Sequence, residues 1–164
     1  MNYPILIILA FVGIVLQSTI LHHVQVGGVT PDLILVLVVF HSIFQGPKRG
    51  AIFGFALGLM EDIMLGRFIG MNALAKGMTS LLVGGLAQRA FRENILVPIF
   101  TLFLGTLFNE LIYLMLGKLT GLNWSWELWL WKAIPIAIYN TCLVPFVYSR
   151  FYYWSTGERE NHAL

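Results

Sequence analysis

Six long apolar segments, separated by short polar or glycine- and proline-containing turns, constrain this chain more than any other feature. A helix needs about 20 mainly apolar residues to cross the roughly 30 Å hydrocarbon core of a membrane. The segments approach that length. They are Pro4–Leu21, Asp32–Gln45, Pro47–Leu65, Gly70–Gln88, Ile95–Gly117 and Trp129–Phe151. They predict an all-α membrane protein, folded as a compact bundle of about six transmembrane helices.

The composition agrees with a lipid-exposed surface. Hydrophobic residues make up 58% of the 164 residues and charged residues only 11%, against about 25% charged in soluble domains. Basic residues form no run longer than Lys48-Arg49, which argues against nucleic acid as a partner because such binding needs a basic surface. We expect one transmembrane domain over residues 1–154 and a short cytoplasmic tail over residues 155–164.

The second segment is short for a membrane span. Asp32–Gln45 would be only about 21 Å long as a helix, at 1.5 Å per residue. Two interpretations are open: a re-entrant segment, and a short helix buried among its neighbours.

The distribution of Lys and Arg predicts the orientation, because these residues are enriched in cytoplasmic loops. With six spans, the predicted cytoplasmic side holds Lys48, Arg49, Arg89, Arg92, Arg150 and Arg159, and the opposite side holds Arg67, Lys118 and Lys132. The C-terminus is therefore predicted to be cytoplasmic.

Glycines recur at every fourth position at the start of the third segment. Gly46, Gly50, Gly54 and Gly58 would form one ridge of a helix, and Gly66 and Gly70 continue the spacing. Helices in lipid associate by close packing, so ridges of small residues become contact faces. The ridge either packs inside this chain, which we favour, or docks the helix of a partner.

Charged residues within the third and fourth segments suggest a buried polar network. Asp62 and Lys76 lie at similar distances along the chain from the turn between these segments, so they are expected at similar depth, close to Asn72. An unpaired charge in a membrane helix is costly. The expected network is a structural clasp, favoured over half of a proton relay.

Two further polar positions are candidates for the same interior. Glu110 follows Asn109 near the middle of the fifth segment. We consider three states of Glu110: protonated, hydrogen-bonded to Asn140 of the sixth segment, or facing water. Asp32 is expected to cap the second helix, where free N–H groups attract a carboxylate, and to have no further role.

Patterns typical of catalysis are absent from the sequence. No HExxH, CxxC, GxSxG or phosphate-binding glycine loop occurs, and these are the patterns that would place metal ligands or a nucleophile. We therefore expect no enzyme activity, no metal and no cofactor.

The stretch Pro31–Gly84 resembles the rod shape-determining protein MreD family. It contains PDL at the start of the second segment, a GP turn, the four-residue glycine spacing and an acid at Asp62. The resemblance implies a fold like that of the substrate-binding subunits of energy-coupling-factor transporters. It also implies a non-enzymatic scaffold of cell elongation and peptidoglycan synthesis in the bacterial inner membrane. The implied partners are MreC, the transglycosylase–transpeptidase pair, the MreB filament and membrane lipid.

An alternative function is a solute-binding subunit of a vitamin-type transporter, which the same fold would suit. Such subunits usually carry an Ala-x-x-x-Ala pair on the first helix, whereas here Ala10 is followed by Ile14. An enzyme acting on lipid-linked precursors is a third and weaker hypothesis.

Overall fold

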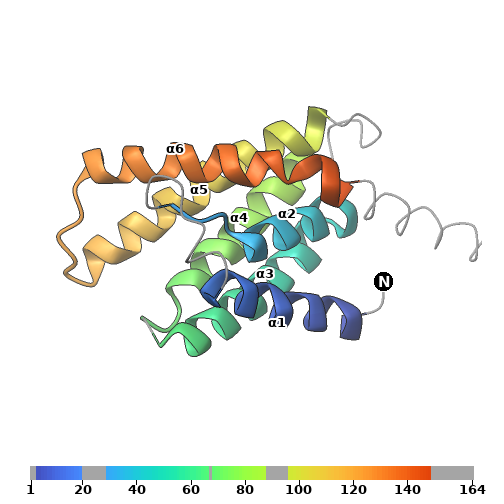
Figure 1. Ribbon diagram of the computed structural model, residues 1–164, viewed down its shortest axis with the longest axis horizontal. Coiled ribbons are helices and arrows are strands. Elements are labelled where there is room, and N and C mark those ends of the chain that lie inside the picture. The colour runs from blue at the N-terminus through green and yellow to red at the C-terminus, as the bar shows by residue number, and fades with distance from the viewer. Residues whose placement is uncertain (1–2, 20–28, 67, 88–95, 149–164) are drawn as a thin grey trace, which may run out of the picture.

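The structure, a computed structural model, describes residues 3–19, 29–66, 68–87 and 96–148. Within these ranges the chain is helical and contains no β-strand. The helices are α1 (Tyr3–Thr19), α2 (Leu33–Gln45), α3 (Pro47–Leu65), α4 (Met71–Ala87), α5 (Leu96–Leu119) and α6 (Trp126–Cys142), followed by a helical turn over 144–148. Figure 1 shows that successive helices run in opposite directions and form one bundle.

The short helix α2 lies inside this bundle. It contacts α1, α3, α4 and α5, and nine of its 13 residues are buried. A helix that is apolar on all sides needs such surroundings. The described arrangement agrees with a short helix buried among its neighbours.

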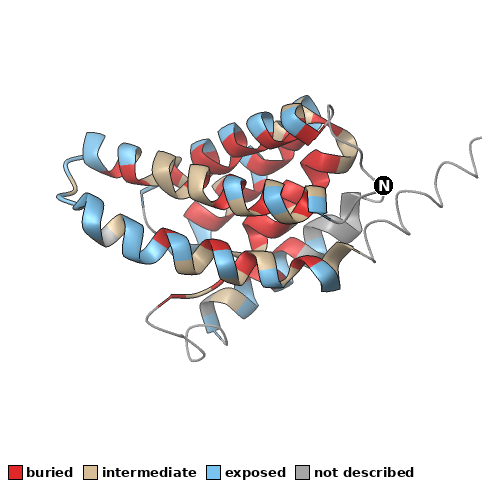
Figure 2. Cartoon of the chain, turned by 90° about the horizontal axis from the view of Figure 1, so that it is seen from above, coloured by how far each residue is buried: buried red, intermediate tan, exposed pale blue. Residues whose placement is uncertain are grey.

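Apolar side chains form both the core and much of the outer surface, and a smaller set of polar and charged side chains is buried between the helices. Buried polar side chains include Lys76, Asp62, Glu61, Asn109 and Asn140, each at most 4% exposed. Large apolar residues are exposed on every helix except α2, and Figure 2 colours all exposed positions of the chain pale blue. Ionisable residues in membrane helices face the bundle interior, so this distribution suits a protein surrounded by lipid.

The glycine ridge of α3 packs against helices of the same chain. Gly50 faces α2, and Gly54 and Gly58 face α4. A Cβ atom on Gly58 would lie 2.5 Å from the Asn72 carbonyl oxygen, and one on Gly54 would lie 2.8 Å from the Lys76 carbonyl oxygen. Real Cβ atoms do not approach this closely, so glycine is what allows α3 and α4 to touch.

Three glycines of the same spacing form turns and do not lie on the ridge. Gly46 joins α2 to α3, while Gly66 and Gly70 flank the α3–α4 turn, and all three have positive φ angles of 91°, 62° and 102°. Glycine adopts such angles without steric cost. The expectation that Gly46, Gly66 and Gly70 extend the ridge is therefore wrong.

The prolines affect the fifth and sixth helices differently. Pro98 lies in the first turn of α5, where its missing N–H would have no helical partner, and α5 continues through it. Before Pro145, α6 ends at Cys142, and the Leu143 N–H donates a short-range bond to the Asn140 carbonyl oxygen at 3.1 Å.

The helix ends are sorted to two sides of the bundle. The α2–α3 turn, the end of α4, the start of α5 and the end of α6 lie on one side in Figure 1, and the α3–α4 and α5–α6 turns lie on the other. Lys48 and Arg49 belong to the first side. Residues 89–94 and 149–164, which carry the other basic residues predicted to be cytoplasmic, fall outside the described residues.

Candidate functional site

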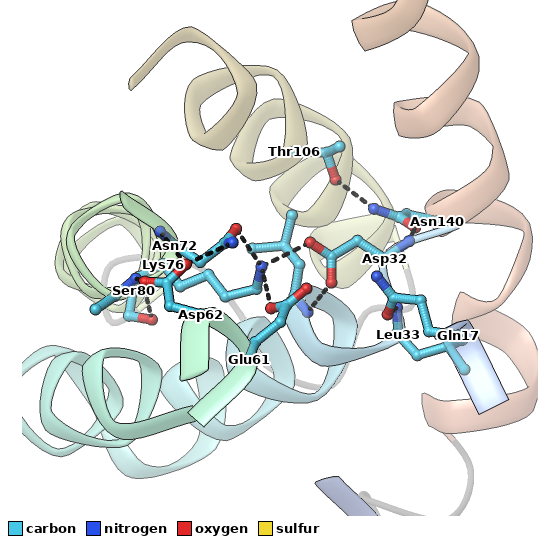
Figure 3. A network of polar contacts seen from close by, with 12 residues as sticks. Gln17, Asp32, Leu33, Glu61, Asp62, Asn72, Lys76, Ser80, Thr106 and Asn140 are labelled. Atoms are coloured by element: carbon cyan, nitrogen blue, oxygen red, sulfur yellow. Dashed lines mark hydrogen bonds and ion pairs between the residues drawn. The ribbon is translucent and has the colours of Figure 1, made fainter. Parts of the chain in front are cut away.

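Lys76 forms the centre of a polar network between the helices. Its side chain is fully buried, and its Nζ lies 2.8 Å from Asp32 Oδ2 and 2.8 Å from Glu61 Oε2. It also donates a hydrogen bond of 3.3 Å to Asn72 Oδ1. Figure 3 shows the ammonium facing oxygen atoms from three elements, namely the segment before α2, α3 and α4.

Asp62 has different partners from those predicted. Its carboxylate accepts bonds from the backbone N–H groups of Gly70 at 2.8 Å, Asn72 at 3.2 Å and Ala73 at 3.2 Å, and from Asn72 Nδ2 at 2.9 Å. Asp62 therefore caps the start of α4. The predicted Asp62–Lys76 ion pair does not form between these described residues, and Asn72 links the two side chains instead.

Asp32 connects four helices. Its Oδ1 accepts the Leu35 N–H at 2.8 Å, which caps α2 as predicted. Its Oδ2 binds Lys76, so the expectation that Asp32 has no role beyond the cap is wrong. Its backbone N–H donates to Asn140 Oδ1 of α6 at 2.8 Å, and Asn140 Nδ2 donates to Thr106 Oγ1 of α5 at 3.2 Å.

The Asn140 side chain thus forms hydrogen bonds with Asp32 and Thr106. The hydrogen bond between Asn140 and Glu110 that the sequence suggested is not among its described contacts. Glu110 instead faces a cavity. Its neighbour Asn109 is 2% exposed, and the Asn109 Oδ1 has no hydrogen-bond partner among the described residues.

A polar cavity of about 420 Å³ adjoins the network. It lies at the N-terminal end of α2, where this short helix leaves space between its longer neighbours. Its lining combines residues from five helices and from the segment before α2: Ile14, Gln17, Thr30, Asp32, Glu61, Leu65, Asn72, Glu110, Tyr113 and Ile136. Three of these side chains are carboxylates.

A second cavity of about 210 Å³ shares Glu110 and Tyr113 with the first. Its other lining residues are Leu114, Trp124, Ser125, Trp129 and Lys132. The Trp124 ring stacks on Tyr113 with centroids 5.6 Å apart. Lys118 does not line this cavity; its Nζ lies 4.4 Å from the centre of the Trp126 ring.

The described residues contain no cluster of side chains that could bind a metal ion. No group of three or more His, Cys, Asp or Glu side chains there could hold a metal ion. The His22-His23 pair lies outside the described residues. His41 is buried against Phe53, with ring centroids 4.2 Å apart.

Sequence reasoning missed the pairing of Glu61 and Asp32 with Lys76. A signal for it exists, because Asp32 and Glu61 lie at nearly equal distances along the chain from the Gly46 turn and are therefore at similar depth. Gln17 was also missed: its side-chain oxygen accepts the Leu33 N–H at 3.2 Å. No motif marks a single glutamine of this kind.

A helical bundle with large exposed apolar side chains and charged side chains buried between its helices is typical of the membrane-embedded class of protein. Among the described helices, α5 alone is both long enough and apolar enough to cross a membrane, judged by length and composition. The helix α2 is apolar but shorter. The family model for the rod shape-determining protein MreD matches residues 1–153, so the chain belongs to the MreD family, whose members are membrane proteins of the cell-shape system. Neither the curated proteins nor the solved structures contain a match.

Membership of this family implies a role in rod shape determination. The absence of a matching solved structure leaves the expected likeness to energy-coupling-factor transporter subunits unsupported.

Proposed function

We propose that this chain is a non-enzymatic, multi-pass scaffold of the bacterial inner membrane that binds MreC and organises peptidoglycan synthesis during cell elongation. The observation that carries the proposal is the family match over residues 1–153. The burial of Lys76 and Glu61 between the helices supports the multi-pass arrangement, since a membrane helix that carries a charged side chain must hide it from lipid.

The packing of the bundle limits where a partner can bind. Gly50, Gly54 and Gly58 are covered by α2 and α4, so the glycine ridge is not free to dock a second protein. A partner helix in the membrane would meet the outer apolar faces, which present side chains such as Ile52 of α3, Phe100 of α5 and Ile138 of α6.

Depletion of the protein in a rod-shaped bacterium tests the proposal. Cells should become round while the wall-synthesis enzymes remain present. A photo-crosslinking residue placed at Ile52, Phe100 and Ile138 in turn should capture MreC from at least one face, and the same residue at Leu57, which is 3% exposed, should capture none. Rods of normal shape after depletion would refute the proposal.

A second candidate, the solute-binding subunit of a vitamin-type transporter, is favoured by the 420 Å³ cavity, whose size lies within the range of about 300–1,000 Å³ typical of small-molecule sites. It forecasts the opposite phenotype: depletion would leave the rod shape intact and abolish the uptake of one small nutrient.

A further inference from the structure

The larger cavity has more negative than positive groups at its wall. Asp32 and Glu61 share the Lys76 ammonium, and the remaining N–H of Lys76 is directed at Asn72. Glu110 is the third carboxylate of the lining and has no ion pair within the described part of the chain. Three carboxyl groups line this cavity and no basic side chain of the described residues does. Buried polar and ionisable groups need partners, so this cavity is suited to a ligand with a positive group that donates hydrogen bonds.

The geometry selects an organic cation over a metal ion. The described acidic side chains do not converge in a way that could hold a metal, and about 420 Å³ is the volume of a small-molecule site. The surrounding acceptors are carboxylate and amide oxygens, which pair best with a group that has several N–H donors. A primary ammonium meets this requirement, whereas a trimethylammonium group has no N–H to donate.

The adjoining cavity adds a basic side chain, Lys132, to the carboxylate Glu110 that both cavities share. Lys132 lines this second cavity together with Ser125 and three aromatic side chains. The second cavity shares Glu110 and Tyr113 with the first. Lys118 is held over the Trp126 ring, so Lys132 is the basic side chain that lines this space.

We propose that the two cavities together bind a zwitterion. Its primary ammonium lies among Asp32, Glu61 and Glu110, and its phosphate-type anionic group lies at Lys132. The same chemistry occurs in the head group of an ethanolamine phospholipid and in free phosphoethanolamine. Binding of this ligand does not depend on binding of a partner protein. A failure to detect the ligand and a failure of the scaffold function are therefore separate outcomes.

Lipid and ligand binding to the full-length protein in detergent provides the test. Native mass spectrometry measures how much phosphatidylethanolamine and phosphatidylcholine remain bound, and melting temperatures are compared with free phosphoethanolamine and phosphocholine. We expect about tenfold preference for the ethanolamine form, which corresponds to one charge-assisted hydrogen bond. Preference in the lipid arm identifies a membrane ligand, and preference only in the soluble arm identifies a free one.

Matched variants assign the binding to this site. Glu110→Gln should lower retention of the ethanolamine ligand about tenfold, while Glu127→Gln, an exposed change in the first turn of α6 that lines neither cavity, should not. Lys132→Gln should also weaken binding, with Lys118→Gln as its control. Because Lys132 is exposed, its variant keeps the test decisive if Glu110→Gln fails to fold. Equal binding of choline and ethanolamine ligands, or unchanged retention in both variants, would overturn the proposal.

Discussion

At the scale of single residues, Lys76 shows how a membrane-embedded helix can hold a full charge. An isolated charge at the centre of such a helix costs about 2.5–3.5 kcal/mol on insertion scales. Here the ammonium forms ion pairs of 2.8 Å with Asp32 and Glu61 and donates a hydrogen bond to Asn72. Removing the lysine would leave both carboxylates buried without their cation.

We therefore expect Lys76 to be energetically coupled to Glu61. In a double-mutant cycle of Lys76→Met and Glu61→Gln, the coupling energy should be about 1–3 kcal/mol, because the two residues are in direct contact. The measurement is the free energy of unfolding in detergent. Losing both residues should cost less than the sum of the single losses.

The matched cycle uses Asp62→Asn in place of Glu61→Gln. Asp62 bonds to the start of α4 and reaches Lys76 only through Asn72, so its coupling should be smaller than that of Glu61. A larger coupling for Asp62 would restore the pair predicted from the sequence and contradict the described geometry.

The reason that the sequence misplaced this pair is geometric. Distance from a turn predicts depth in the membrane but not direction around the helix, and adjacent helical residues point about 100° apart. Glu61 and Asp62 therefore share a depth but face different neighbours. The free N–H groups at the start of α4 take Asp62, which leaves Glu61 for Lys76.

At the scale of helices, the α3–α4 contact depends on glycine only at some positions. A Cβ atom at Gly58 would lie 2.5 Å from a backbone oxygen of α4, whereas one at Gly77, on the facing helix, would have its nearest neighbour at 3.5 Å. Only the first position requires glycine for packing.

We expect Gly58→Ala to destabilise the protein by about 1–3 kcal/mol, the usual cost of overpacking. Gly77→Ala should be neutral or stabilising by up to about 1 kcal/mol, because alanine favours the helix over glycine. Thermal unfolding of both variants in detergent compares them directly. Equal behaviour of the two would show that the close approach of α3 and α4 is not set by Gly58.

Helix positions were easier to predict than contacts. Glycine and proline punctuate the chain, and the bounds of α2 and α3 follow from Gly46, Pro47 and Gly66. The sixth segment was predicted to begin at Trp129, whereas α6 begins at Trp126, directly after Ser125, a typical helix-capping residue. The cavity was not predictable, because its lining residues come from five helices and the segment before α2, and distance along the chain does not fix their directions around the helices.

At the scale of the whole molecule, the basic residues and the sorted helix ends bear on orientation. Lys48 and Arg49 lie on the side where α6 ends. From the positive-inside tendency we therefore propose that the C-terminal end of the chain is cytoplasmic.

A cysteine placed at position 158 should therefore be inaccessible to an impermeant thiol reagent added outside intact cells. The background is Cys142→Ala, which removes the one native cysteine. A cysteine at Asn123, exposed in the α5–α6 connection on the opposite side, serves as the positive control and should react. Strong labelling at position 158 with none at 123 would invert the orientation.

The close contact between α3 and α4 also bears on how the chain enters the bilayer. The helix α3 carries Glu61 and Asp62 and does not by itself meet the criterion for a membrane span. The groups that neutralise or bond these acids, Lys76 and the start of α4, are translated afterwards. We expect α3 to leave the translocation channel only together with α4, as a helical hairpin. Nascent chains truncated after residue 66 should integrate poorly in a glycosylation-reporter assay and those truncated after residue 95 well, and equal integration would show that α3 enters alone.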